Sequence, residues 1–350
     1  MTHTGVTDTD TNVEREDRMP LFGKAHLFSG SLRSPEPEPP LDKPVQWGVD
    51  SEVGRLREVL LCKPDYWAID SNANAVTRAA VDAGFDFDLE AAKRQHREFA
   101  KLFEREGVII RWLPELPSQI SQTYTRDSSF MTPWGVVVTQ MQAEVRRGEY
   151  LAIVDYCQRR NIPIWNKVTA GTLEGGDVHV AKPGKLLIGY SQGRTTKDGA
   201  MQVLNWFAEK GWDGRLIKID PHFLHLDLLF CMVDADTAIL CRDGLSNSQI
   251  DEIVHFLELK HVIYATYKQA MRLLCNVLAL GNRKVIMHQD ADNVDLVRQL
   301  KEFRYEALEV DLSSFTSDGG GPHCLAMSYR RDYLDRGLST AFDCENGLLR

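Results

Sequence analysis

The chain has 350 residues and a formal net charge of −9, and 43% of its residues are hydrophobic. A chain of this length and composition can bury a sizeable core, as one large domain or two small ones. Its lysines and arginines are scattered, which argues against a nucleic-acid-binding surface. No apolar run reaches the roughly 18 residues of a membrane span, and the N-terminus lacks the basic and apolar segments of a signal peptide. These features predict a cytoplasmic globular protein that binds neither nucleic acid nor membrane.

The cysteines indicate neither a disulfide framework nor a structural zinc site. There are seven of them, an odd number, and no two are arranged as C-x-x-C. We therefore expect free thiols.

The first segment, residues 1–44, is rich in Thr, Asp, Ser and Pro and ends in SPEPEPPLDKP. Such a segment buries too little apolar surface to order itself, so it is predicted to be a flexible tail. Residues 45–350 are predicted to form a single domain.

Within this domain, short apolar segments recur at intervals of about 40 to 75 residues, which suggests internal repetition. Strands are expected in REVLLCKP, GVVVTQ, GKLLIGYS, DTAILCRD, RKVIMHQD and CLAMSYRRD, which start at residues 57, 135, 184, 236, 283 and 324. Amphipathic spacing predicts helices after Asp88 and over residues 150–160, 201–208, 250–257 and 294–303. Alternating strands and helices indicate an α/β or α+β fold. VDADTAILC and CNVLALGNRKVIMH are typical of hairpins, so mixed sheets are expected.

Four polar clusters stand at the ends of apolar segments: YTRDSSF at 124–130, LEGGDVHV at 173–180, HLDLLF at 225–230 and SDGGGPHCLAMS at 317–328. In the last cluster, three glycines and a proline precede Cys324 and allow the backbone to approach a ligand closely. Taken alone, Cys324 is more simply interpreted as a small buried residue. His323 beside it is not decisive, because adjacent strand side chains point to opposite faces.

The HLDLLF cluster suggests proton transfer. His225 and Asp227 are two residues apart, so on a strand they share one face. A histidine beside a carboxylate suits acid–base chemistry near neutral pH. The alternative is a surface pair with no chemical role.

Two other interpretations of these clusters compete. His179 and His225, with nearby carboxylates such as Glu174 and Asp177, are possible metal ligands, but no helix pairs two histidines at metal-ligand spacing. GYSQG at 189–193 matches the G-x-S-x-G nucleophile elbow. Against it, polar residues follow where an elbow enters its helix, and no HGGG-type segment lies upstream.

Together, and in this order, the clusters resemble segments of the guanidino-group-modifying (pentein) superfamily, which includes arginine deiminases, dimethylargininases and amidinotransferases. The resemblance extends from about residue 45 to the C-terminus and rests on YTRD, LEGGDV, HLDLLF with the following MVD, and GGGPHC. It implies a five-bladed α/β propeller of pseudo-repeated ββαβ units, formed by residues 45–350 as one catalytic domain. GYSQGRTT is similar to the family's G-x-S-x-R-T with one extra residue.

The resemblance also implies the site residues. The nucleophile, the general acid/base and an acidic partner match Cys324, His225 and Glu174. Two carboxylates that grip the guanidinium and two arginines that bind the substrate carboxylate match Asp127, Asp227, Arg146 and Arg194. Arg147 is the alternative to Arg146, and the match at Arg194 requires a one-residue insertion.

The chemistry requires such a set. A guanidinium is planar and resonance-stabilised, so carboxylates must fix the cation while a thiolate attacks its carbon from above the plane. We therefore expect a hydrolase that cleaves a C–N bond of arginine or an arginine derivative through an S-amidino intermediate on Cys324. His225 is expected to protonate the leaving amine and then to activate water. No metal or organic cofactor is expected.

Several alternatives stay open. An amidinotransferase would pass the amidino group to an amine, although Glu174 in LEGGD favours the hydrolases. Arginine deiminases carry a further arginine five residues before the nucleophile, where this chain has Gly319, so dimethylarginine, agmatine-like and other guanidino substrates are alternatives to arginine. If Arg146 and Arg194 both face the site, an α-amino acid is favoured over agmatine. A non-catalytic scaffold is a further alternative, and a homo-oligomer is compatible with the sequence.

Overall fold

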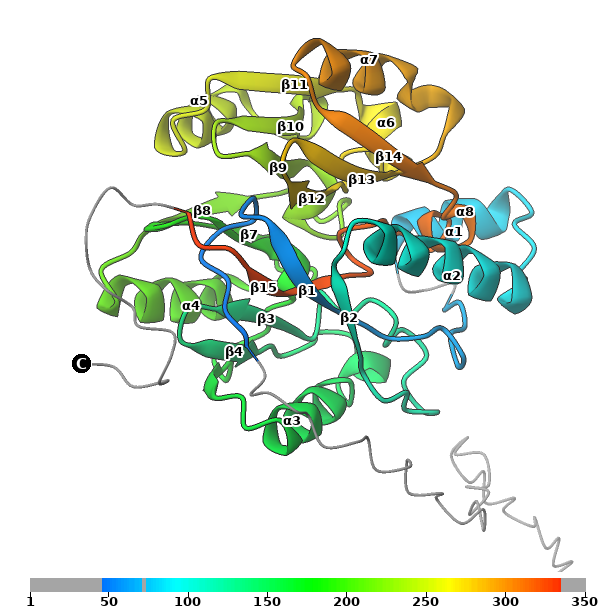
Figure 1. The fold of residues 1–350 in the computed structure, drawn as a ribbon, viewed down its shortest axis with the longest axis horizontal. Helices are drawn as coiled ribbons and strands as arrows, with labels where there is room; N and C mark the ends of the chain where they lie inside the picture. Colours follow the sequence, from blue (N-terminus) through cyan, green and yellow to red (C-terminus); the bar gives the residue numbers. More distant parts are fainter. Residues whose placement is uncertain (1–45, 71–73, 335–350) are drawn as a thin grey trace, which may run out of the picture. The chain divides into compact units, whose positions relative to one another are not determined.

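The computed structural model describes residues 46–70 and 74–334. The predicted tail, residues 1–44, and Cys344 lie outside these ranges. The strands of the described part form five sheets of three strands each (Figure 1). In chain order they are β1 Leu56–Leu61, β2 Ile109–Trp112, β3 Ser129–Thr132, β4 Gly135–Val138, β5 Ile164–Lys167, β6 Val178–Lys182, β7 Lys185–Tyr190, β8 Asp213–Lys218, β9 Phe230–Asp234, β10 Thr237–Cys241, β11 His261–Ala265, β12 Leu278–Gly281, β13 Lys284–His288, β14 Glu306–Val310 and β15 Met327–Arg331.

All five sheets repeat one pattern. The central strand pairs antiparallel with one neighbour and parallel with the other, and the central strands are β1, β4, β7, β10 and β13. The sequence predicted all five, because a central strand is buried on both faces and forms a continuous apolar run. The ββαβ repeat and the five-bladed α/β propeller are therefore confirmed.

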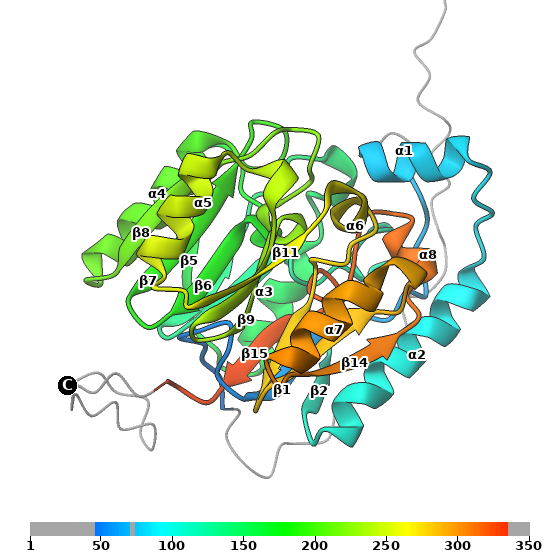
Figure 2. The ribbon, with the colours of Figure 1, turned by 90° about the horizontal axis from the view of Figure 1, so that it is seen from above.

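In each blade a helix joins the central strand to its parallel neighbour, as a parallel crossover requires. These helices are α2 Leu89–Arg105, α3 Tyr150–Arg159, α4 Lys197–Glu209, α5 Asn247–Phe256 and α7 Val294–Glu302. All five were predicted from their spacing of apolar residues. Helix α7 lies against β14 and also against β11 of the neighbouring blade (Figure 2).

Short helices that the sequence did not predict lie between these elements. They are α1 Ala75–Asp82, α6 Tyr267–Met271 and α8 Ser313–Thr316. Five single turns of 3₁₀ helix also occur, η1 Glu144–Arg146, η2 Gly175–Asp177, η3 Leu226–Leu228, η4 Arg242–Gly244 and η5 Ala291–Asn293. Two of these turns carry residues of the predicted site, Arg146 in η1 and Asp227 in η3, and Glu174 directly precedes η2.

The two ends of the described chain meet in the first blade. β15 pairs antiparallel with β1, so the last strand completes the sheet that the first strand began (Figure 1). Cys324 lies three residues before β15 and just after the glycine run. Closure of the propeller therefore fixes the segment that contains Cys324 from its C-terminal side.

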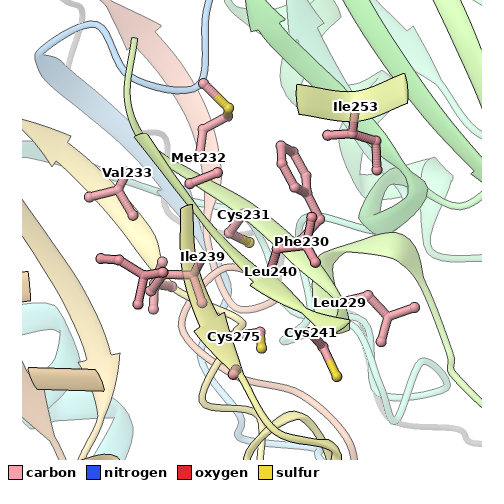
Figure 3. Packing of buried hydrophobic residues seen from close by; sticks show 14 of the residues in the cluster. Leu229, Phe230, Cys231, Met232, Val233, Ile239, Leu240, Cys241, Ile253 and Cys275 are labelled. Atoms are coloured by element: carbon pink, nitrogen blue, oxygen red, sulfur yellow. The ribbon is translucent and has the colours of Figure 1, made fainter. Parts of the chain in front are cut away.

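The described cysteines other than Cys324 are part of the core. Cys231 and Cys241, on the neighbouring strands β9 and β10, lie with Cys275 among aliphatic and aromatic side chains (Figure 3). The described cysteines form no disulfide, as predicted. Burial raises the pKa of Cys157 to about 12, so these thiols stay protonated at neutral pH. No helix in the described part of the chain is long and apolar enough to cross a membrane.

Candidate active site

The four polar clusters meet although they belong to different parts of the chain. Backbone amides join them: Gly175 N donates to Asp127 O (2.9 Å), Leu226 N to Asp177 Oδ1 (2.8 Å), and Arg126 N to Cys324 O (3.2 Å). Each cluster is thus held by another. The predicted site residues are brought together by these bonds rather than by one continuous element.

His225 and Asp227 do not lie on a strand. His225 has an extended backbone and begins the turn η3, which contains Asp227. The predicted shared strand face was wrong, because the Asp177 carboxylate captures the Leu226 N–H and turns the chain at this point. The two side chains consequently lie in different parts of the site, His225 beside Glu174 and Asp227 beside Cys324.

The first half is an acid–base group of Glu174, His225 and Asp127. Nε2 of His225 lies 2.8 Å from Oε2 of Glu174, and Nδ1 lies 3.7 Å from Oδ1 of Asp127. Burial alone would lower the pKa of His225, but the Asp127 and Glu174 carboxylates outweigh it and raise that pKa to about 9. His225 is therefore protonated at neutral pH and can act as an acid.

The second half is the thiol of Cys324 with Asp227. The Sγ atom lies 3.5 Å from Oδ2 of Asp227. Burial, together with the charges of Asp227 and Asp127, raises the pKa of the thiol well above its ordinary value. As it stands, the thiol is a weak nucleophile that needs a positive charge nearby to ionise.

Two carboxylate oxygens in this part of the site are unusual because they are buried without a hydrogen-bond partner in the described part of the chain. Among the described residues, Oδ1 of Asp127 and Oδ1 of Asp227 are buried and accept no hydrogen bond. Buried acceptors normally have a hydrogen-bond partner, and an ionised carboxylate can only accept hydrogen bonds, so these two oxygens need a donor. Together they can receive a cation that carries several N–H groups.

The predicted arginines also reach this region. Nη1 of Arg146 donates to Oδ2 of Asp127 (2.8 Å), and its Nε and Nη2 donate to Glu149 (2.7 and 3.0 Å). Nη1 of Arg194 lies 3.4 Å from Oε2 of Glu174. Arg147, the alternative to Arg146, is exposed and pairs with Glu144. Arg146 and Arg194 therefore face the acid–base group, whereas Arg147 does not.

The metal alternative is not supported by the arrangement of its histidines. His179 groups with Glu52 and His323, whereas His225 groups with Asp127 and Glu174. The two histidines thus belong to different clusters. Ser191 of the G-x-S-x-G match accepts a hydrogen bond from the Gly193 N–H (3.1 Å), which gives it a turn-forming contact rather than a nucleophile's contact with a base.

Comparisons with known proteins agree with this geometry. A family model for arginine deiminase matches residues 121–261. The uncharacterized protein YkgA of Bacillus subtilis is 25% identical over 79% of this chain and 93% of its own length. The N(G),N(G)-dimethylarginine dimethylaminohydrolase of Pseudomonas aeruginosa is 23% identical over 69% of this chain and 90% of its own.

Solved structures show the same fold. The N-terminal domain of ArgZ, an arginine dihydrolase from the ornithine–ammonia cycle in cyanobacteria, superposes with a TM-score of 0.68 at 19% identity, over 77% of this chain and 96% of that one. The dimethylarginine dimethylaminohydrolase of Pseudomonas aeruginosa, complexed with citrulline, gives a TM-score of 0.65 at 20% identity, over 78% and 99%. The chain has the pentein fold of these proteins, and the family-model match and the relatives support the guanidino-group-modifying superfamily.

Asn276, which no sequence pattern indicated, holds the segment that contains Cys324. Oδ1 of Asn276 accepts from the backbone N–H groups of His323 (3.0 Å) and Cys324 (3.2 Å). Its Nδ2 donates to Cys324 Sγ and to Asp227 O, both at 3.2 Å. Asn276 lies at the start of the segment predicted as a hairpin and matches none of the four clusters, so only the packing of the blades identifies it.

Asp318 anchors the other end of the glycine run. Its carboxylate accepts hydrogen bonds from Tyr124 Oη (2.9 Å), Thr77 Oγ1 (3.0 Å) and Trp67 Nε1 (3.3 Å). Gly319 follows with a φ of +86°, and a Cβ atom there would lie 2.7 Å from Leu224 Cδ1. This pentein therefore needs glycine at 319, where the arginine deiminases carry an arginine.

Replacing Asn276 with alanine is expected to raise the thiol pKa of Cys324. Burial raises this pKa most, and the Asn276 N–H is one of the groups that lower it. Loss of one donor to a thiolate should slow alkylation by iodoacetamide about tenfold near pH 8. The rate is measured by mass spectrometry of the Cys324 peptide.

The matched control is Asn293→Ala. Asn293 is also a buried amide, but its Nδ2 donates to His288 O (3.1 Å) and Glu309 Oε1 (2.7 Å) instead. Alkylation of Cys324 should keep its wild-type rate in this variant. Equal rates in both variants would contradict the role given to Asn276.

Proposed function

We propose that this protein hydrolyses a C–N bond in the guanidino group of arginine or an arginine derivative, through a covalent intermediate on Cys324. The observation that carries the proposal is the pair of unsatisfied buried oxygens, Asp127 Oδ1 and Asp227 Oδ1, which belong to the two carboxylates whose charges act on the Cys324 thiol. The names of the relatives, which include a dimethylaminohydrolase, an arginine dihydrolase and arginine deiminases, support the same class of reaction.

Binding is the first step. The guanidinium of the substrate donates N–H groups to the open oxygens of Asp127 and Asp227, which supply negative charge in a buried site. The same carboxylates raise the pKa of the Cys324 thiol when no cation is present. A bound cation offsets their charge and lowers the thiol pKa, so the thiol releases its proton to solvent when substrate arrives.

Attack and departure follow. The thiolate forms a bond to the guanidino carbon, and a tetrahedral adduct results. His225 gives its proton to the leaving nitrogen, the C–N bond breaks, and the amidino group stays on sulfur. Neutral His225 then takes a proton from water, and the hydroxide attacks the same carbon. The S–C bond breaks to restore the thiolate as the C=O bond of the product forms, and the hydroxyl proton of the adduct passes to the released amine or to solvent.

The two arginines favour a substrate with a carboxylate. Arg194 is positioned by Glu174, and Arg146 by Glu149 and Asp127. A substrate carboxylate that bound Arg146 would take a donor now given to Asp127, which frees that aspartate for the guanidinium. An α-amino acid such as arginine or a methylated arginine is the substrate class that this pair favours over agmatine.

The proposal is tested by mass spectrometry of the full chain with arginine, dimethylarginine, agmatine and guanidinoacetate in separate reactions. The expected result is a mass increase on the Cys324 peptide in an acid-quenched sample, together with a urea-type product and free ammonia or an alkylamine. Product formation that requires an added amine such as glycine would instead identify an amidinotransferase. No adduct and no product with any of the compounds would overturn the proposal.

A further inference from the structure

A second group of charged side chains lies buried behind the Cys324 thiol. It consists of Arg126, Glu52, His323 and Asp227, each less than a tenth exposed. Nη2 of Arg126 donates to Oε1 of Glu52 (2.7 Å), and Oε2 of Glu52 lies 3.3 Å from Nε2 of His323. Nδ1 of His323 lies 2.8 Å from Oδ2 of Asp227. The four residues form one continuous relay from Arg126 to Asp227.

The sequence analysis gave His323 no role, because adjacent strand residues point to opposite faces. His323 and Cys324 lie before β15 and not on a strand. Both side chains approach the same carboxylate oxygen, Asp227 Oδ2, at 2.8 and 3.5 Å. His323 therefore contacts the group that neighbours the nucleophile.

The geometry dictates the protonation of His323. Each of its ring nitrogens faces a carboxylate oxygen, and an ionised carboxylate only accepts hydrogen bonds. Both nitrogens must then carry a proton, which makes the ring an imidazolium. The charges of Arg126 and His323 balance those of Glu52 and Asp227, so the buried relay is neutral as a whole.

The surroundings of His323 favour its protonated form. His179 from β6 stacks on it at 5.5 Å between ring centroids and 15° between planes. Burial lowers the pKa of His179 to about 3, so this second ring is neutral. Burial and Arg126 oppose the charge on His323, but hydrogen bonds to Asp227 and Glu52 raise its pKa. Burial would raise the pKa of Asp227, but the bond from His323 outweighs it and that pKa is lowered.

We propose that His323, held by Glu52 and Arg126, is a positioning residue that keeps Asp227 ionised and turned so that its Oδ1 faces the incoming guanidinium. Oδ2 of Asp227 is taken by His323, and Oδ1 is the oxygen that no described residue occupies. His323 does not touch the reacting carbon and acts through Asp227. This inference rests on the proposed function for its kinetic consequence, but not for the charge state of the ring.

The first test uses NMR of the full chain labelled with ¹⁵N-histidine, with the His323→Asn spectrum to assign the signals. His323 should show two protonated nitrogens from about pH 6 to about pH 8. In Glu52→Gln, which keeps a polar group but removes one carboxylate, His323 should titrate near neutral pH. A neutral His323 ring at about pH 7 in the wild-type protein would overturn the inference. Because no substrate is present, this result is independent of the proposed function.

The second test is the pH profile of kcat/KM for His323→Asn. Asparagine retains an N–H donor for Asp227 but carries no charge, so the pKa of Asp227 rises. The acid limb of the profile should then move up by about one pH unit or more, with a larger change in KM than in kcat, because Asp227 binds the cation. Loss of activity that is equal at all pH values would indicate a merely structural role and would overturn the inference.

The matched control is His179→Asn, the same substitution in the stacked ring. Among the described residues His179 makes no hydrogen bond through either nitrogen. The acid limb of the kcat/KM profile of His179→Asn should therefore stay at the wild-type pH, even if the free energy of unfolding falls. If the wild-type protein turned over none of the guanidino compounds, the proposed function would be refuted, while the NMR measurement would still decide the protonation of His323.

Discussion

Cys324→Ser is expected to lower kcat at least a thousandfold, by roughly the loss that follows removal of a catalytic nucleophile. A serine hydroxyl ionises far less readily than a thiol, and a bound guanidinium between Asp127 and Asp227 does not supply enough charge to offset that difference. The side chain is buried and the exchange of sulfur for oxygen is small, so the fold should be retained. Stopped-time assays of ammonia or alkylamine release, with circular dichroism as a check of folding, measure both effects.

A second cysteine provides the control for this substitution. Cys157 is also buried, and burial raises its pKa to about 12, but it lies on α3 within the core. Cys157→Ser should keep kcat within about twofold, although a new buried hydroxyl costs about 1–3 kcal/mol of unfolding free energy. Cys324→Ser that retained full turnover, or an adduct found on another cysteine, would contradict the assignment of the nucleophile.

The sequence predicted the parts of the fold that follow from burial on both faces. The strand over Lys284–His288 is an uninterrupted apolar run at the centre of its blade, whereas its parallel neighbour Glu306–Val310 is half exposed and gave no comparable signal. The five connecting helices were predicted for a related reason, because each buries one stripe of apolar residues. The short helices and edge strands such as β2, β5 and β14 carry weaker patterns and were found only in the structure, whereas the edge strand β15 was predicted in CLAMSYRRD.

The candidate site likewise consists of residues that the sequence predicted and residues that only the structure identified. Cys324, His225 and Glu174 lie in short motifs whose residue types and order match a known superfamily. Glu52 and Asn276 are far from those motifs in sequence, and their importance depends on which blades pack together. The conformation of His225 to Leu228 was predicted wrongly because a tertiary hydrogen bond to Asp177 overrides the strand-like spacing of the segment.

Glu174→Gln is the substitution with the second largest expected effect. Oε2 of Glu174 lies 2.8 Å from His225 Nε2 and 3.4 Å from Arg194 Nη1, and Oε1 accepts from the Gln142 N–H (3.1 Å). Glutamine preserves the shape but removes the charge. The pKa of His225, raised to about 9 by Asp127 and Glu174 against burial, must then fall. At neutral pH a smaller fraction of His225 can protonate the leaving amine, and kcat should drop by roughly 10²- to 10⁴-fold.

The pH dependence distinguishes this account from simple damage to the site. An acid acts in its protonated form, so kcat of the wild-type protein should fall as pH rises through the pKa of His225, near 9. In Glu174→Gln the same fall should occur at lower pH, whereas Glu144→Gln, an exposed carboxylate on η1, should leave the profile in place. A substrate with a weakly basic leaving nitrogen needs less protonation and should lose less rate in Glu174→Gln. An unmoved alkaline limb, or an equal loss for both substrates, would show that Glu174 does not set the acidity of His225.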